Sequence, residues 1–89
     1  MAMDKIPYEQ LIDMVMAARG KVKPGSTWQH YKGDQYIVSD IAVTEAGNEP
    51  AVVYSAVVRP DILFVRSLSE WFDMIDWNNE TRQRFTELV

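Results

Sequence analysis

The chain has 89 residues, 47% of them hydrophobic, with 9 Lys and Arg against 13 Asp and Glu. This length predicts one domain, because a chain of this size supports a single hydrophobic core. The absence of cysteine excludes a disulfide framework and a thiolate zinc site. A net charge of -4 argues against nonspecific nucleic-acid binding by the whole surface, since binding to phosphates depends on basic groups.

The sequence carries no membrane or export signal of the usual kind. No stretch reaches the roughly 18 to 20 consecutive apolar residues that a membrane span needs. The segment Met1 to Lys5 lacks the charged and then apolar layout of a signal peptide. We therefore expect a cytoplasmic protein with no membrane partner.

Residues 7–19 have the spacing of an amphipathic helix, with apolar side chains at i, i+3, i+4 and i+7. Asp4 is available as an N-cap, Pro7 suits the first turn, and Gly20 can take the left-handed conformation that ends a helix. Residues 1–23 are thus predicted to form an N-terminal helical extension. The apolar stripe consists of Tyr8, Leu11, Ile12, Val15 and Ala18, and Met14 and Met16 widen it.

The sequence after the helix changes to β-branched and aromatic content divided by turn residues. The turns separate predicted strands near residues 26–31, 35–45, 51–58 and 62–66. Every linker is too short for a parallel crossover, so antiparallel hairpins are expected. The strand at 51–58 is apolar on both faces, which is typical of the middle of a sheet.

The C-terminal part is predicted to add two short elements. Ser67 or Ser69 can cap a helical turn over residues 69–75, and Asn78-Asn79 can turn a last hairpin into residues 82–85. The whole pattern predicts a mainly β protein with an N-terminal α-helix, in which residues 24–89 form a small SH3-like antiparallel β-barrel, or roll. The apolar cluster between Trp71 and Trp77 is interpreted as the plug of this barrel, or as a partner surface if part of it is exposed.

Charges are sorted along the chain. Residues 14–33 contain four basic residues and no acidic one, whereas residues 67–81 contain four acidic residues and no basic one. The basic segment is a candidate for local binding of a phosphate or another anion; the alternative is a pair of solvated faces. The basic segment of one copy can also meet the acidic segment of another, so a homodimer is expected.

Motifs for catalysis are missing. The chain has one histidine and neither a glycine-rich phosphate loop nor a zinc-binding HExxH helix, so we expect no catalytic residue, no metal site and no cofactor. His30 with Glu45 as an acid–base pair is the one enzymatic hypothesis, and it has little support from spacing alone. A non-enzymatic protein is therefore predicted.

Arg66 alternates with Ile62 and Phe64, which are expected to face an apolar environment. A charge there needs a partner. Two interpretations stay open: an ion pair with Glu45 or Glu49, or a guanidinium at a pocket mouth that binds a carboxylate or phosphate. The tyrosines of the strands are similarly ambiguous, because their rings suit the core and their hydroxyls suit the rim.

An ordered series of motifs resembles a small bacterial and phage family, domain of unknown function 1653. The series is His30-Tyr31-Lys32-Gly33, Tyr36, Val38, Thr44-Glu45, Val52-Val53-Tyr54, Val65-Arg66 and Phe72. The resemblance spans roughly residues 24–85, leaves the helix outside, and implies an SH3-like barrel with no established activity. The family pattern has Trp and Pro around the Val-Arg unit, which this chain lacks. The resemblance implies a candidate ligand-binding set of His30, Tyr31, Lys32, Glu45, Tyr54 and Arg66.

Two functions follow as hypotheses. The first is a binding module whose open barrel end captures a small anionic ligand such as a nucleotide; in a phage such a module would sequester a host signalling nucleotide. The second is a protein–protein interaction or self-association through the helix at 7–20 or the Trp71–Trp77 cluster.

Overall fold

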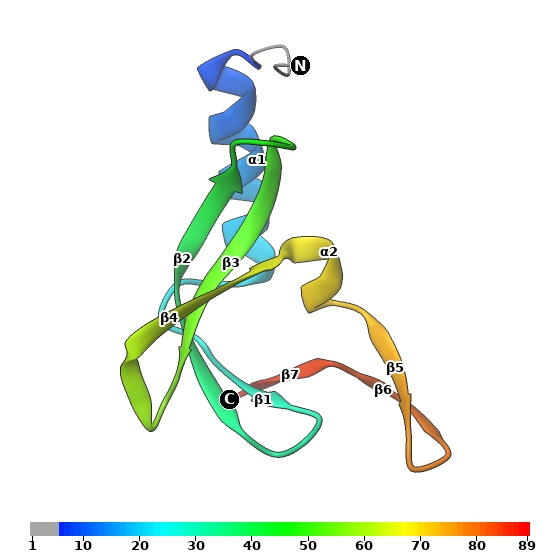
Figure 1. The fold of residues 1–89 in the computed structure, drawn as a ribbon. Coiled ribbons are helices and arrows are strands. Elements are labelled where there is room, and N and C mark those ends of the chain that lie inside the picture. Colours follow the sequence, from blue (N-terminus) through cyan, green and yellow to red (C-terminus); the bar gives the residue numbers. More distant parts are fainter. Residues whose placement is uncertain (1–5) are drawn as a thin grey trace.

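The structure, a computed structural model, describes residues 6–89 and is mainly β with an N-terminal helix, as the sequence predicts (Figure 1). No helix in this part of the chain is long and apolar enough to cross a membrane. The elements in chain order are α1 (Tyr8–Lys21), β1 (Thr27–His30), β2 (Gln35–Thr44), β3 (Glu49–Ala56), β4 (Arg59–Ser67), α2 (Leu68–Trp71), β5 (Met74–Trp77), β6 (Glu80–Gln83) and β7 (Phe85–Leu88).

The strands form one five-stranded antiparallel sheet, in the order β4-β3-β2-β1-β7, and a separate β5-β6 hairpin. The first four strands match the predicted ranges to within a few residues. β3 lies inside the sheet, between β2 and β4, although the middle position belongs to β2. The last strand, β7, was not predicted, and it brings the C-terminal segment alongside β1.

The sheet does not close into the predicted SH3-like barrel. Its edge strands, β4 and β7, are not paired with each other in the described residues. The register of β4 gives a local reason: residues 64–67 pair with β3, but residues 60–63 all lie opposite Ser55. Such a bulge interrupts the ladder and bends the strand. The chain then leaves the sheet into α2 instead of continuing the curl towards β7 (Figure 1).

The bulged edge strand β4 also exposes side chains that the alternation of the sequence predicts to be buried. Ile62 and Phe64 are exposed, as are Leu63 and Val65 between them. The expectation that Ile62 and Phe64 face an apolar environment is therefore wrong. Sequence alternation cannot separate an edge strand from an interior one, because both carry apolar residues at the same spacing.

The ends of α1 differ in detail from the prediction. Gly20 lies within the helix, which ends at Lys21, where the backbone N–H of Val22 donates to the carbonyl of Ala18 at 2.9 Å. Val22 is extended and fully buried, so the chain leaves the helix where this side chain enters the core. Pro7 precedes the first helical residue and supplies no side-chain cap. The predicted cap Asp4 lies outside the described residues.

The core forms where α1, the sheet and α2 meet. Trp71 is fully buried and stacks on Phe85, with ring centroids 3.8 Å apart and an interplanar angle of 7°. Trp71 thus fills the core, whereas Trp77, at the other end of the predicted cluster, is partly exposed. Ser67 caps α2 by accepting from the N–H of Glu70 at 3.2 Å, although α2 is shorter than the predicted turn.

The predicted hairpin turn at Asn78-Asn79 is confirmed between β5 and β6. Both residues have positive φ, 54° and 64°, as a two-residue type I′ turn requires. Asparagine tolerates this conformation better than most residues, so the local sequence suffices to predict the turn.

Candidate functional site

Four aromatic rings from four strands pack against one another, with Tyr54 and Phe85 buried in the core. Tyr54 of β3 lies 5.4 Å from Tyr36 of β2 and 5.8 Å from Phe85 of β7, centroid to centroid. His30 of β1 lies 5.1 Å from Phe85 and 6.2 Å from Tyr36. All four contacts are edge-to-face, a favoured geometry for aromatic pairs. We call these four residues the aromatic floor.

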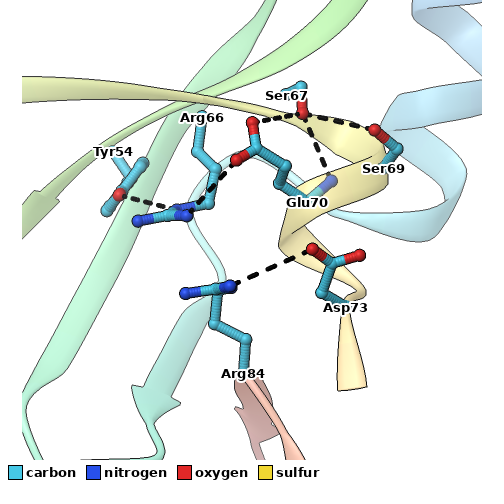
Figure 2. Close-up of polar contacts among 7 residues, drawn as sticks. All are labelled: Tyr54, Arg66, Ser67, Ser69, Glu70, Asp73 and Arg84. Atoms are coloured by element: carbon cyan, nitrogen blue, oxygen red, sulfur yellow. Dashed lines mark hydrogen bonds and ion pairs between the residues drawn. The ribbon is translucent and has the colours of Figure 1, made fainter. Parts of the chain in front are cut away.

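Arg66 lies against this floor (Figure 2). Its Nε donates to the Tyr54 hydroxyl at 3.5 Å, and its Cζ lies 5.9 Å from the centre of the Phe85 ring. The side chain is 28% exposed and faces Glu70, with Nη1 3.8 Å from a carboxylate oxygen. Because Phe85 begins β7, Arg66 reaches from one edge strand of the sheet to the other.

The partner of Arg66 is therefore Glu70, and the sequence-based choice of Glu45 or Glu49 is wrong. α2 follows β4 directly, so Glu70 comes four residues after Arg66 and turns back over it. Glu45 and Glu49 lie at the hairpin end of β2 and β3, beyond the Ala51–Ser67 pair where β4 leaves the sheet.

Arg84 is the second arginine of the site, and sequence reasoning missed it. It immediately precedes β7, and its side chain, 22% exposed, has Nη2 3.9 Å from a carboxylate oxygen of Asp73. Its backbone N–H donates to the Asp73 carbonyl at 2.9 Å. Within residues 6–89, the buried Nε of Arg84 has no hydrogen-bond partner. In the sequence, polar Arg84 and Thr86 alternate with apolar Phe85, as in a strand with one buried face. This alternation points to Arg84 only once residues 85–88 are known to form β7.

The two arginines lie on either side of the unpaired gap between β4 and β7, which we call the seam, and the charges of both act on His30. Figure 2 shows both guanidinium groups extending to the same side of α2. Each is paired with a half-exposed carboxylate at a distance near the limit for an ion pair. Exposed pairs of this kind contribute about 0 to 1 kcal/mol. Glu70 and Asp73 therefore hold the two guanidinium groups only weakly.

The same ion pairs change the interpretation of the acidic segment 67–81. Glu70 and Asp73 are partnered by Arg66 and Arg84, which lie outside that segment. The segment is therefore not a uniformly negative face. Folding pairs two of its charges with basic residues that flank the segment on either side.

His30 adds a polar group to the seam. Burial lowers its pKa, and the positive charges of Arg66, Arg84 and Lys32 lower it further, while Asp34 opposes the shift. The backbone N–H of Lys32 donates to Nδ1 at 3.3 Å, which suits the neutral tautomer with its proton on Nε2. His30 is thus held as a neutral donor. Burial together with Asp34 raises the pKa of Tyr36, so this hydroxyl stays protonated.

Two further predicted residues adjoin the floor at the turn after β1. The ring of Tyr31 lies 4.3 Å from His30 and 5.6 Å from Trp77, and the ammonium of Lys32 lies 5.8 Å from the Tyr31 ring. Lys32 is exposed and Tyr31 half-buried. Gly33 completes this turn at φ 110°, a conformation that a residue with a side chain rarely adopts.

Glu45 does not join the other predicted site residues. It lies in the turn after β2, at the opposite end of that strand from His30. The strand has ten residues, and a strand rises about 3.3 Å per residue. The structure therefore separates His30 from Glu45, the pair considered for acid–base catalysis. His30, Tyr54 and Arg66 converge, and Tyr31 and Lys32 lie next to them.

The hollows that reach the aromatic floor are lined by neither Arg66 nor Arg84. A hollow of 370 Å³ reaches Tyr36 of the floor, and a smaller one of 140 Å³ reaches His30 and Tyr31. Another hollow, of 380 Å³, lies elsewhere, next to α2 and Phe72. In the described part of the chain no group of three His, Asp or Glu residues could hold a metal ion. A ligand at the arginines would lie on an open surface and extend towards Tyr36.

Comparison with known proteins agrees with the family resemblance. Residues 26–87 match the family model described as "Protein of unknown function (DUF1653)". The chain belongs to the DUF1653 family. The crystal structure of a DUF1653 protein from Bordetella bronchiseptica is similar, with a TM-score of 0.65 and 28% identity over 79% of this chain and 90% of that one. No curated protein matches. The DUF1653 match begins after α1, so the seam lies within the family region and the helix outside it.

Proposed function

We propose that this DUF1653 protein is a non-enzymatic binding module that captures a small anionic ligand, such as a nucleotide, at the seam. The main observation is that two half-buried arginines, Arg66 and Arg84, extend from opposite edges of one sheet to the same side of α2. Guanidinium groups bind phosphate and carboxylate through pairs of parallel N–H donors. A ligand bound by both would join the two edges of the sheet.

The surroundings suit a ligand with an anionic head and an organic body. The neutral His30 and the Tyr54 hydroxyl supply further hydrogen bonds beside the arginines. The hollow beside Tyr36, lined also by Val57 and Val58, has the volume of a small-molecule site, for which about 300 to 1,000 Å³ is typical. The body of a nucleotide would pack there against an aromatic and aliphatic wall.

The arrangement favours capture over catalysis. A hydrolytic mechanism needs a base near its nucleophile or water, and His30 lies far from the carboxylate considered for that role. A chain without cysteine is well suited to the reducing cytosol, where nucleotides are abundant. The protein would act there by sequestering its ligand, the role expected of a phage-encoded module.

Thermal unfolding with a panel of anions tests this proposal. The panel contains inorganic phosphate, pyrophosphate, nucleoside mono- and triphosphates and sugar phosphates, all at one ionic strength. A ligand present at a hundredfold excess over its Kd stabilises the fold by about 2.7 kcal/mol, and its signal should be absent in Arg66→Gln and Arg84→Gln. Mass spectrometry should recover the ligand unchanged.

Arg59→Gln is the matched control, because Arg59 is well exposed and pairs with its neighbour Asp61, at 2.8 Å. It should keep the whole response to the ligand. The proposal fails if no anion in the panel stabilises the protein, or if Arg59→Gln loses as much of the response as the two seam variants.

A second candidate function is protein–protein interaction, and one observation favours it. Three large apolar side chains of α1 point away from the sheet: Tyr8, Ile12 and Met16 are 81%, 55% and 64% exposed. The alternative surface, the Trp71–Trp77 cluster, is less suited because Trp71 is fully buried in the core. An interaction through α1 would lie outside the region matched to DUF1653.

A further inference from the structure

The outer side of α1 carries a groove that no described residue covers. Only Ala18 of this helix is buried, and Val15 packs at the margin of the core. Figure 1 shows the first turns of α1 projecting past the tip of the β2–β3 hairpin. The groove, of 320 Å³, runs between two rows of side chains spaced four residues apart. The rows are Tyr8, Ile12 and Met16, and Leu11, Val15 and Arg19.

Rows spaced four residues apart are the ridges that pack into the grooves of a second helix. The charges of α1 indicate which helix fits. Glu9 and Asp13 lie in its first half, and Arg19 and Lys21 lie in its last turn. An antiparallel copy of the same helix places acidic against basic residues at both ends, by symmetry.

We propose that α1 pairs with α1 of a second copy, in antiparallel orientation, to form a homodimer. In the register that best matches the charges, Ile12 packs against the partner's Met16, and Glu9 faces the partner's Arg19. Tyr8 then lies at the level of the partner's Gly20, where an added Cβ would meet no atom within 4 Å. Methionine suits such a contact because its flexible side chain adapts to the opposing surface.

Arg19 remains available for this contact although it is already paired. Its guanidinium binds the carboxylate of Asp40 at 3.1 and 3.3 Å, which holds it in place at the edge of the groove. The side chain is still half exposed, so Glu9 of the second copy can approach its open side. The dimer is independent of the seam and does not rest on the anion-binding proposal.

Sedimentation equilibrium over a concentration series gives the first test. We expect reversible association of the 10.3 kDa chain into a dimer, and a Kd about tenfold or more weaker in Met16→Glu, since a buried unpaired charge is unfavourable. Leu63→Glu is the control, because Leu63 of β4 is an apolar residue 60% exposed, against 64% for Met16, and its replacement should leave association unchanged. A 10.3 kDa species at every concentration up to millimolar, or equal loss in both variants, would overturn the proposal.

A charge exchange tests the antiparallel register. Glu9→Lys and Arg19→Glu should each weaken their own homodimer, because like charges then meet at both ends. A mixture of the two variants should restore the dimer, because every pair is opposite again. Both residues are on the surface, and circular dichroism checks that each variant is folded. Dimers that persist in both variants, or a mixture that stays monomeric, would exclude this pairing.

Discussion

At the scale of single residues, the seam shows how one side chain can serve both stability and binding. The guanidinium carbon of Arg66 lies 5.9 Å from the centre of the Phe85 ring, and the guanidinium nitrogens contact Tyr54 and Glu70 at the long distances of 3.5 and 3.8 Å. A guanidinium against an aromatic ring contributes to stability even where its ion pair contributes little. The same group keeps hydrogen-bonding capacity for a ligand.

Replacing Arg66 by Ala should destabilise the fold by about 1 to 2 kcal/mol, through lost packing on Phe85 and the lost contact to Tyr54. Lys32→Ala, which removes an exposed side chain, should change the free energy of unfolding by less than about 0.5 kcal/mol. Urea titrations of the two variants give the comparison. Equal denaturation midpoints would show that Arg66 does not support the fold.

His30 predicts a dependence of stability on pH. Its pKa is lowered in the folded state by burial and by Arg66, Arg84 and Lys32, whereas the unfolded chain titrates near the usual value of about 6.5. The unfolded state therefore binds the proton first as the pH falls. The contribution of neutral His30 to the free energy of unfolding is fully present above the unfolded pKa of about 6.5. It is lost as the pH falls through the lower pKa of the folded state.

The free energy of unfolding should accordingly decrease between pH 7 and 5, and His30→Gln should remove this part of the slope. An unchanged slope in His30→Gln would assign the effect to other groups. The lowered pKa values of Asp40 and Asp61 act at more acidic pH, because both groups start from the ordinary carboxylate range.

At the scale of elements, β3 and β6 are opposite extremes of burial and strand pairing. β3 has a partner strand on each side, and Ala51, Val52, Tyr54 and Ser55 are all buried. β6 belongs to a two-stranded sheet, and all four of its residues are exposed. Isolated two-stranded hairpins are marginally stable, whereas interior strands open only when the whole domain unfolds.

Amide hydrogen exchange should therefore be slowest in β3 and fast in β6. We expect the amides of residues 51–55 to exchange through global unfolding, with rates that follow the denaturant dependence of the whole domain. Those of residues 80–83 should exchange by local opening without that dependence. Comparable protection in the two segments would contradict the assignment of β3 to the sheet interior.

At the scale of the whole molecule, the C-terminal strand completes a core begun by distant segments. Phe85 stacks on Trp71 of α2 and contacts His30, Tyr36 and Tyr54 of three other strands. These contacts join residues between 14 and 55 positions apart in the chain. The stability of the sheet therefore depends on a strand that is only four residues long.

Phe85→Ala should destabilise the domain by about 3 to 5 kcal/mol, the usual range for deleting a buried aromatic ring. This is a large share of the roughly 5 to 15 kcal/mol that stabilises a small domain. Met74→Ala, at an exposed position in the β5–β6 hairpin, is the control and should have little effect. Chemical denaturation measures both, and a Phe85→Ala variant as stable as Met74→Ala would contradict the central position of the ring.

The sequence by itself determined the features that depend on neighbouring residues. The helix spacing at residues 7–19, the turn at Asn78-Asn79 and the run of antiparallel hairpins follow from side-chain period and turn conformation, which are local. The family motifs placed His30, Tyr54 and Arg66 in one candidate set, and the structure brings these three together.

Tertiary structure alone decided the rest. Pairing of β7 with β1 brought Arg84 to the seam. The bulge in β4 and the departure of the chain into α2 left the sheet unclosed. The length of β2 kept Glu45 away from His30. Each of these depends on which distant segments meet. Such contacts form when their combined burial outweighs the entropy of closing long loops, and no local pattern encodes that balance.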